Sequence, residues 1–110
     1  MKKLKDFEPK LLESIASKAN MAMFGATAKG SRGGCGRVYI EFLETIRSNS
    51  KIKKIFERSG FKMTKRPMYS GVRIYVGYDN ATGYEFDMAE KACEVLKSYD
   101  IRCYVDGDGD

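Results

Sequence analysis

Two short stretches of the sequence place a tyrosine two residues after an arginine, namely Arg37 with Tyr39 and Arg73 with Tyr75. In an extended chain, side chains two residues apart point to the same side. Each pair would therefore present a cation beside an aromatic ring. Aromatic rings stack on splayed nucleobases, while arginine and lysine neutralise phosphates. The pattern is typical of surfaces that bind single-stranded nucleic acid.

The residues around both pairs alternate between apolar and polar types, as strands with one buried face do. Residues 37–42 and 72–78 each predict a strand, and two more are predicted over residues 61–66 and 101–105. If the apolar sides face a core, the period of two determines what the other side carries. The candidate binding residues on that side are Arg37, Tyr39, Lys62, Arg66, Arg73, Tyr75, Arg102 and Tyr104, accompanied by Glu41, Thr64 and Gly77.

Three helices are predicted between and before these strands. Leucine, isoleucine and alanine recur at helical spacing in residues 8–24, where Asp6 would cap the first turn. A second amphipathic helix spans about residues 48–60. A third follows the capping box that Thr82 and Glu85 would form.

The predicted order is therefore a helix followed by β-α-β-β-α-β. Two split β-α-β units with right-handed crossovers give an α+β, ferredoxin-like βαββαβ sandwich, whose four-stranded antiparallel sheet has the strand order 4-1-3-2 and helices on one face. A chain of 110 residues forms a single domain. Its predicted parts are an N-terminal helix over residues 8–24, a glycine-rich basic loop over 25–36, the βαββαβ unit over 37–105 and an acidic tail over 106–110.

The docking place of the N-terminal helix is left open by the sequence. This helix must bury its apolar side, and the sheet face opposite the other helices is one available place. Its packing partners there would be Tyr39, Tyr75 and Tyr104. A covered face would leave hydroxyls and arginine heads at its rim, which makes an interaction surface rather than a stacking platform.

The glycine-rich loop adds two cations, Lys29 and Arg32, to the candidate binding residues. Backbone amides beside glycine can approach a phosphate closely, so the loop could form an anion-binding nest. It matches neither phosphate-loop motif, however, and it leads into a strand, whereas those loops lead into a helix. A basic loop that orders on a polyanion, a plain linker and a small-nucleotide site are all compatible with it.

Charge is distributed unevenly along the chain. Residues 1–78 contain 17 Lys and Arg against 6 Asp and Glu, whereas residues 79–110 contain 3 against 9, so +11 and −6 combine to the net charge of +5. A basic surface backed by an acidic one suits a polyanion, or two copies that attract each other. The distribution predicts a nucleic acid or a protein as the partner and is compatible with a homodimer.

Composition disfavours several protein classes. The chain lacks histidine, which is the commonest general base and metal ligand, and its three cysteines form no C-x-x-C. We therefore expect no enzymatic activity, no cofactor and no metal. A run of about 18 apolar residues that could span a membrane is absent, and no signal-peptide core follows the first lysines. We expect a cytoplasmic protein.

The first predicted strand resembles the opening signature of the RNA-recognition-motif family. Residues 38–43, VYIEFL, form an aliphatic-aromatic-aliphatic run that ends in leucine. The βαββαβ order matches that family over residues 37–105, whereas residues 70–78 lack its basic-glycine-aromatic opening. The resemblance implies that Tyr39 and Tyr75 stack on bases.

The leading interpretation is a small, non-enzymatic basic protein that binds nucleic acid, with RNA or single strands preferred. It would use the Tyr/Arg sheet face and the glycine-rich loop. The alternative is a protein-interaction or inhibitor module, of the phage or mobile-element type, that acts on a host nucleic-acid-processing or defence complex. A third interpretation is a protein that binds a small nucleotide in the loop.

Overall fold

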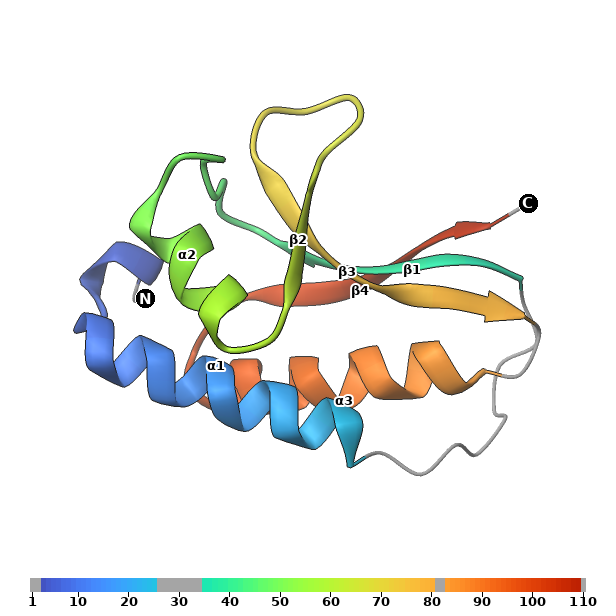
Figure 1. The fold of residues 1–110 in the computed structure, drawn as a ribbon, viewed down its shortest axis with the longest axis horizontal. Helices are drawn as coiled ribbons and strands as arrows, with labels where there is room; N and C mark the ends of the chain where they lie inside the picture. The colour runs from blue at the N-terminus through green and yellow to red at the C-terminus, as the bar shows by residue number, and fades with distance from the viewer. Residues whose placement is uncertain (1–2, 26–34, 81–82, 110) are drawn as a thin grey trace.

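The computed structural model describes residues 3–25, 35–80 and 83–109 of the chain (Figure 1). Its elements are a short 3-10 helix Leu4–Asp6, α1 Pro9–Phe24, β1 Cys35–Phe42, α2 Lys51–Arg58, β2 Lys62–Lys65, β3 Val72–Asn80, α3 Tyr84–Ser98 and β4 Cys103–Gly109. This is the predicted order of a helix followed by β-α-β-β-α-β. None of the described helices has the length and apolarity that a membrane crossing requires.

A four-stranded antiparallel sheet forms one layer of the molecule. β3 pairs with β2 and β1, and β1 pairs on its other side with β4, which gives the order β2-β3-β1-β4. The predicted strand order and the α+β class with an open antiparallel sheet are confirmed. β1 is buried on both faces, because no residue from Val38 to Phe42 is more than 6 % exposed.

All three helices lie on the same side of this sheet. α1 packs mainly against α3 and also contacts α2, while α3 contacts β1, β3 and β4 (Figure 1). Leu12 and Ile15 of α1 share one apolar core with Val38 and Ile40 of β1. Small, fully buried residues on α1 and α3 suit a close approach of the two helices; they are Ala16, Ala19, Ala89 and Ala92. The N-terminal helix therefore does not cover the opposite sheet face.

Two helix starts differ from the prediction. The 3-10 helix intervenes before α1, and the carboxylate of Asp6 accepts a hydrogen bond from the Lys3 backbone N–H at 3.2 Å instead of capping α1. α2 begins later than residue 48. Its cap is Ser50, whose Oγ accepts a hydrogen bond from the Lys53 backbone N–H at 3.2 Å.

The residues from Asp106 to Gly109 form a strand, so the predicted tail over 106–110 was wrong for this stretch. β1 starts at Cys35, and its first residues continue the ladder with β4, which places Gly36 opposite Gly109. Strand pairing outweighs the low strand propensity of glycine and aspartate here. The predicted loop over 25–36 consequently ends earlier than expected.

A β-bulge changes the predicted alternation of β3. Val38 and Tyr39 are adjacent on β1, but their partners Gly77 and Tyr75 are two positions apart, so one residue of β3 is extra. Gly77 therefore lies on the side of Val38, facing α3, where an added Cβ would lie 3.2 Å from Glu85 Cγ. The prediction that Gly77 lies on the other face was wrong.

A buried aspartate organises the start of α3. Asp79 is fully buried, and its carboxylate accepts hydrogen bonds from the backbone N–H groups of Gly83 at 2.9 Å and Phe86 at 3.4 Å. It supplies the acceptor that a capping residue would supply, and its negative charge suits the positive end of the helix. Thr82, the predicted cap, lies outside the described residues.

Replacing Glu85 by glutamine should stabilise the domain at neutral pH. Burial, and then the neighbouring carboxylate of Asp79, raise the pKa of Glu85 in the folded chain. Protonated Glu85 is therefore favoured by folding, and this contribution is present below the ordinary glutamate pKa and is lost as the pH rises through the raised value. Urea unfolding should show Glu85→Gln to be more stable than the native chain at about pH 7, and no more stable at about pH 4. An equal difference at both pH values would contradict this assignment.

Candidate functional site

The described candidate residues gather on the sheet face that points away from the helices, which we call the open face. Cross-strand partners share one side of a sheet. Tyr39 lies opposite Tyr75 of β3 and Asp106 of β4, and Lys62 lies opposite Tyr75. The open face consists of Arg37, Tyr39, Glu41, Lys62, Thr64, Arg66, Arg73, Tyr75, Tyr78, Arg102, Tyr104 and Asp106.

Glu41 lies at the centre of the open face between two arginines. Its carboxylate accepts a hydrogen bond from Arg73 Nη1 at 3.0 Å and lies 3.2 Å from Arg66 Nε. Arg73 Nη1 also lies 4.0 Å from Asp106 Oδ2. Glu41 and Arg73 are 4 % and 9 % exposed. Water screens such charges little, so their attraction is strong and an unpaired charge would be costly.

Tyr39 is covered by Arg73. The guanidinium carbon lies 3.5 Å from the centre of the Tyr39 ring, and the ring centres of Tyr39 and Tyr75 are 5.5 Å apart. The first contact is a cation–π interaction, which holds the arginine over the ring. A base could stack on Tyr39 only after displacing Arg73. The structure thus makes Tyr39 a support for Arg73 rather than an accessible ring.

Tyr75 and Tyr104 are the rings that the predicted set leaves accessible. Tyr75 is half-buried, with Lys62 Nζ 5.5 Å from its ring centre, and Tyr104 is 44 % exposed opposite Glu41. Within the described residues, neither Lys62 nor Arg102 forms an ion pair with a carboxylate. These two cations are therefore available to an external anion.

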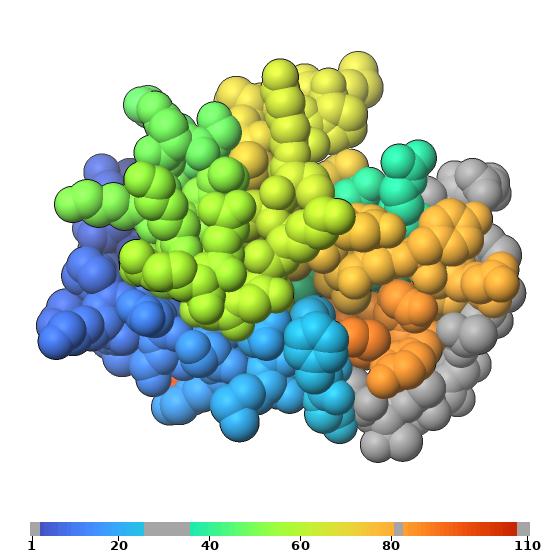
Figure 2. Space-filling view, viewed as in Figure 1, coloured from blue at the N-terminus to red at the C-terminus, as the bar shows by residue number. Residues whose placement is uncertain are grey.

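The hairpin between β2 and β3 adds an exposed tip beside the open face. Met68 and Tyr69 are 85 % and 68 % exposed, and the Arg66 guanidinium lies 4.9 Å from the centre of the Tyr69 ring. Figure 2 shows this hairpin in yellow at the upper edge of the molecule. Arg66 connects the tip to Glu41 because it contacts both.

Several buried polar atoms around Glu41 lack a hydrogen-bond partner among the described residues. They are Glu41 Oε1, Thr64 Oγ1, Arg66 Nε and Arg73 Nε. Arg66 Nε and Glu41 Oε1 are close enough for an ion pair but are not aligned for a hydrogen bond. Buried polar groups in native proteins are normally satisfied by protein, water or ligand. The centre of the open face therefore has donors and acceptors that can still bind water or a ligand.

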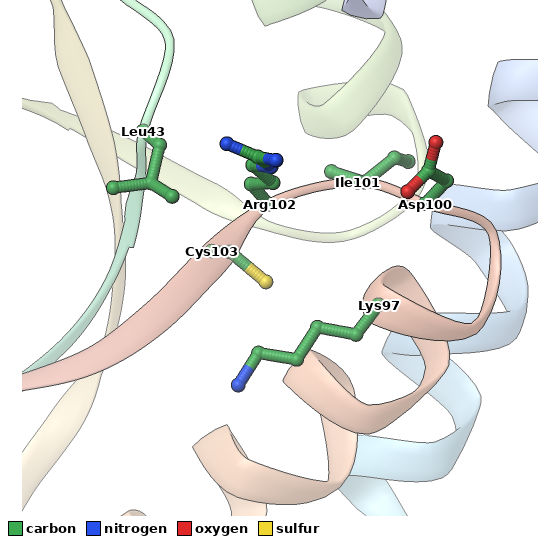
Figure 3. Close-up of a pocket in the computed structure, with 6 residues that line it drawn as sticks. All are labelled: Leu43, Lys97, Asp100, Ile101, Arg102 and Cys103. Atoms are coloured by element: carbon green, nitrogen blue, oxygen red, sulfur yellow. The ribbon is translucent and has the colours of Figure 1, made fainter. Parts of the chain in front are cut away.

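Several hollows of the surface are lined by residues outside this cluster. One pocket of about 380 Å³ at the end of α3 is lined by Leu43, Lys97, Asp100, Ile101, Arg102 and Cys103 (Figure 3). Arg102 and Cys103 point to opposite sides of the strand in Figure 3, as consecutive strand residues do. Among the residues that the structure describes, no three Cys, Asp or Glu side chains converge as a metal site.

Strand pairing places Arg37 and Lys62 on the same face as the tyrosines, as predicted. Arg102 points to the side of the chain opposite Cys103, which is also the side of the open face (Figure 3). Lys29 and Arg32 lie outside the described residues, and so does the small-nucleotide site that the loop suggested. The candidate site that can be described is therefore the open face alone.

Sequence reasoning missed three residues of this region. Tyr78 lies opposite Arg37 because of the β-bulge, and glycine inside a strand pattern, here Gly77, is the sequence signal for such a bulge. Asp106 was assigned to the tail, and Tyr69 lies between two predicted strands and was given no role. The residue types around these two positions did not indicate that either side chain contacts an arginine.

Comparison with known proteins assigns no family to the chain. No protein-family model matches it, and no curated protein and no solved structure matches it either. The open face is therefore interpreted from its own geometry, and the resemblance of residues 38–43 to the RNA-recognition-motif signature stays an expectation.

Replacing Glu41 by glutamine should destabilise the domain. The change removes the negative charge between two guanidinium groups that are largely buried, and we expect the free energy of unfolding to fall by about 2–4 kcal/mol. Glu94→Gln is the matched control, because Glu94 is exposed and its ion pair with Lys91 lies at the surface. Urea unfolding measures both. A loss no larger than that of Glu94→Gln would show that the cluster does not hold the face together.

Proposed function

We propose that this chain is a small, non-enzymatic nucleic-acid-binding protein that prefers RNA or single strands to duplex DNA. In this proposal the βαββαβ unit is a ferredoxin-like sandwich, and the open face is its binding surface. The protein would act in the cytoplasm and without a cofactor.

The observation that carries the proposal is the combination, on the open face, of partly exposed tyrosine rings with cations that form no ion pair within the described residues. Tyr75 and Tyr104 flank β1 on its two sides, with Lys62 beyond Tyr75 and Arg102 two residues before Tyr104 in the chain. A single strand that crosses the sheet from β4 to β2 would meet both rings and both cations. Bases of a duplex are stacked on one another, so they offer no free faces to such rings.

Glu41 determines where the phosphates of a bound strand would lie. It neutralises Arg66 and Arg73 at the centre of the face, and Asp106 adds to this effect. Phosphates would therefore follow the periphery, at Lys62 and Arg102. The bases would turn inward to the tyrosine rings.

Binding of labelled single-stranded RNA, single-stranded DNA and duplex of one sequence at two salt concentrations tests the proposal. We expect the single strands to bind more tightly than the duplex, and their affinity to fall as the salt concentration rises. Absence of single-strand binding at low salt, by a chain that circular dichroism shows to be folded, would reject the function.

Lys62→Ala and Lys65→Ala form a matched pair of variants. Both lysines belong to β2 and both changes remove one positive charge, but three positions separate them, so their side chains lie on opposite sides of the strand. Lys62→Ala should weaken single-strand binding and lower the slope of log affinity against log salt by about 1. Lys65→Ala should leave both nearly unchanged. Equal effects of the two changes on affinity and salt slope would mean that the net positive charge of the chain, rather than the open face, attracts the nucleic acid.

Tyr104→Leu and Tyr84→Leu test stacking in the same assay. The two tyrosines are similarly exposed, at 44 % and 38 %, but Tyr84 lies at the start of α3 on the helix side. Tyr104→Leu should weaken binding by about 1–3 kcal/mol, which is the cost of one lost base contact. Tyr84→Leu should retain native affinity. If Tyr104→Leu also binds like the native chain, its ring is not part of the stacking surface.

A second candidate function is favoured by the hairpin tip. Large exposed side chains such as Met68 and Tyr69 are common where proteins contact each other. The chain would then be an interaction or inhibitor module, of the phage or mobile-element type, for a host nucleic-acid-processing or defence complex. Met68→Ser with Tyr69→Ser separates the two functions, because it should abolish a complex with such a partner and leave oligonucleotide affinity unchanged.

A further inference from the structure

Two cysteines lie side by side where α3 meets β4. Cys93 and Cys103 are both buried, and Cys103 Sγ lies 4.0 Å from the carbonyl oxygen of Cys93. We propose that Cys93 and Cys103 are a dithiol oxidation site that closes to an intramolecular disulfide.

The architecture brings the two side chains together. Cys103 and Gly107 are on the side of β4 that faces α3, since an added Cβ at Gly107 would lie 2.8 Å from Phe86 Cζ. Cys93 belongs to the buried stripe of α3, together with Leu96. The strand directly follows the helix in the chain, so the pair closes a short loop, and short loops are quick to close.

Each of the two buried cysteines borders a hollow of the surface. Cys103 lines the pocket of about 380 Å³ in Figure 3, and Cys93 lines a neighbouring one of about 320 Å³. Lys97 lines both pockets. In Figure 3 the sulfur of Cys103 points to the same side of the strand as Lys97. A low-molecular-weight oxidant in either hollow would thus lie beside one cysteine of the pair.

The two thiols are chemically unequal. A hydrogen bond from the Cys93 thiol lowers the pKa of Cys103 against the effect of burial, and the ammonium group of Lys97 acts in the same direction. The same hydrogen bond, together with burial, raises the pKa of Cys93. Cys103 therefore forms the thiolate more readily and attacks the oxidant first. Cys93 then attacks the mixed disulfide that forms on Cys103.

The oxidant is a low-molecular-weight disulfide. The thiolate of Cys103 attacks one of its sulfurs, which breaks that S–S bond, releases one thiolate and leaves a mixed disulfide on Cys103. Cys93 gives its proton to the released thiolate and attacks Cys103 Sγ, which expels the second small thiolate; this one takes up a proton from water. Two protein thiols are oxidised and one small disulfide is reduced to two thiols.

The position of β4 accommodates the new bond. Cysteine Cα atoms in a disulfide are usually about 4.4–6.8 Å apart, so a strand and a helix must lie close where they are joined. β4 is an edge strand that pairs, among the described strands, with β1 alone. A small shift toward α3 therefore disturbs one ladder rather than two.

Oxidised glutathione, added to the folded full chain carrying Cys35→Ser, tests the proposal. This background removes the third cysteine, so every change in thiol content or mass comes from the pair. We expect the chain to lose the mass of two hydrogen atoms and both free thiols. Digestion with trypsin without reduction should give residues 92–97 joined to residues 103–110 by a disulfide. Dithiothreitol should restore both thiols.

Further removal of Cys93 supplies the matched control. In the variant with Cys35→Ser and Cys93→Ser the reaction should stop at the mixed disulfide, so the chain gains the mass of one glutathione on Cys103. A stable glutathione adduct on the chain that still has Cys93 would overturn the proposal. So would two thiols that stay reduced at every ratio of oxidised to reduced glutathione until the chain is unfolded. Both decisive results come from the Cys35→Ser chain, so the assignment stays testable if the double variant does not fold.

Discussion

The buried carboxylate of Glu41 is the constraint on which the open face depends. A negative charge at the centre of a sheet must be paired, and the partners come from two other strands, because Arg66 follows β2 and Arg73 belongs to β3. Arg73 is thereby held against the ring of Tyr39. One acidic side chain thus decides which tyrosine is covered, and it leaves the positive charge that an anion can use at the edges of the face.

The charges of the open face also favour packing of the helices on the other side of the sheet. A helix laid across the open face would remove water from cations such as Lys62 and Arg102, which have no carboxylate partner among the described residues, and this costs free energy. α1 carries leucine, isoleucine and alanine on its buried side, and α3 offers a matching surface. Packing helix on helix buries the apolar stripe of α1 and leaves the charged face hydrated.

Periodicity in the sequence was sufficient for the order of the elements, because residues 37–42 and 72–78 alternate clearly and the helices between the strands have apolar stripes. The right-handedness of β-α-β crossovers then gave the strand order. Alternation carries no information about an inserted residue, so the bulge that moves Gly77 to the helix side was not predicted. The acidic, glycine-rich end of β4 was taken for a tail because its propensity for strands is low, and pairing with β1 outweighs that propensity. The burial of Tyr39 depends on the conformation of Arg73, which a pattern of residue types does not specify.

Side chains of β4 alternate between the helix side of the sheet and the open face. Cys103 faces α3, while Arg102 and Tyr104 on either side of it belong to the open face. A shift of β4 that brings Cys103 closer to Cys93 must carry its neighbours with it. If the open face binds nucleic acid as proposed, oxidation of the dithiol changes the position of one ring and one cation of that surface. The two proposals are then coupled through a single edge strand, although either can hold without the other.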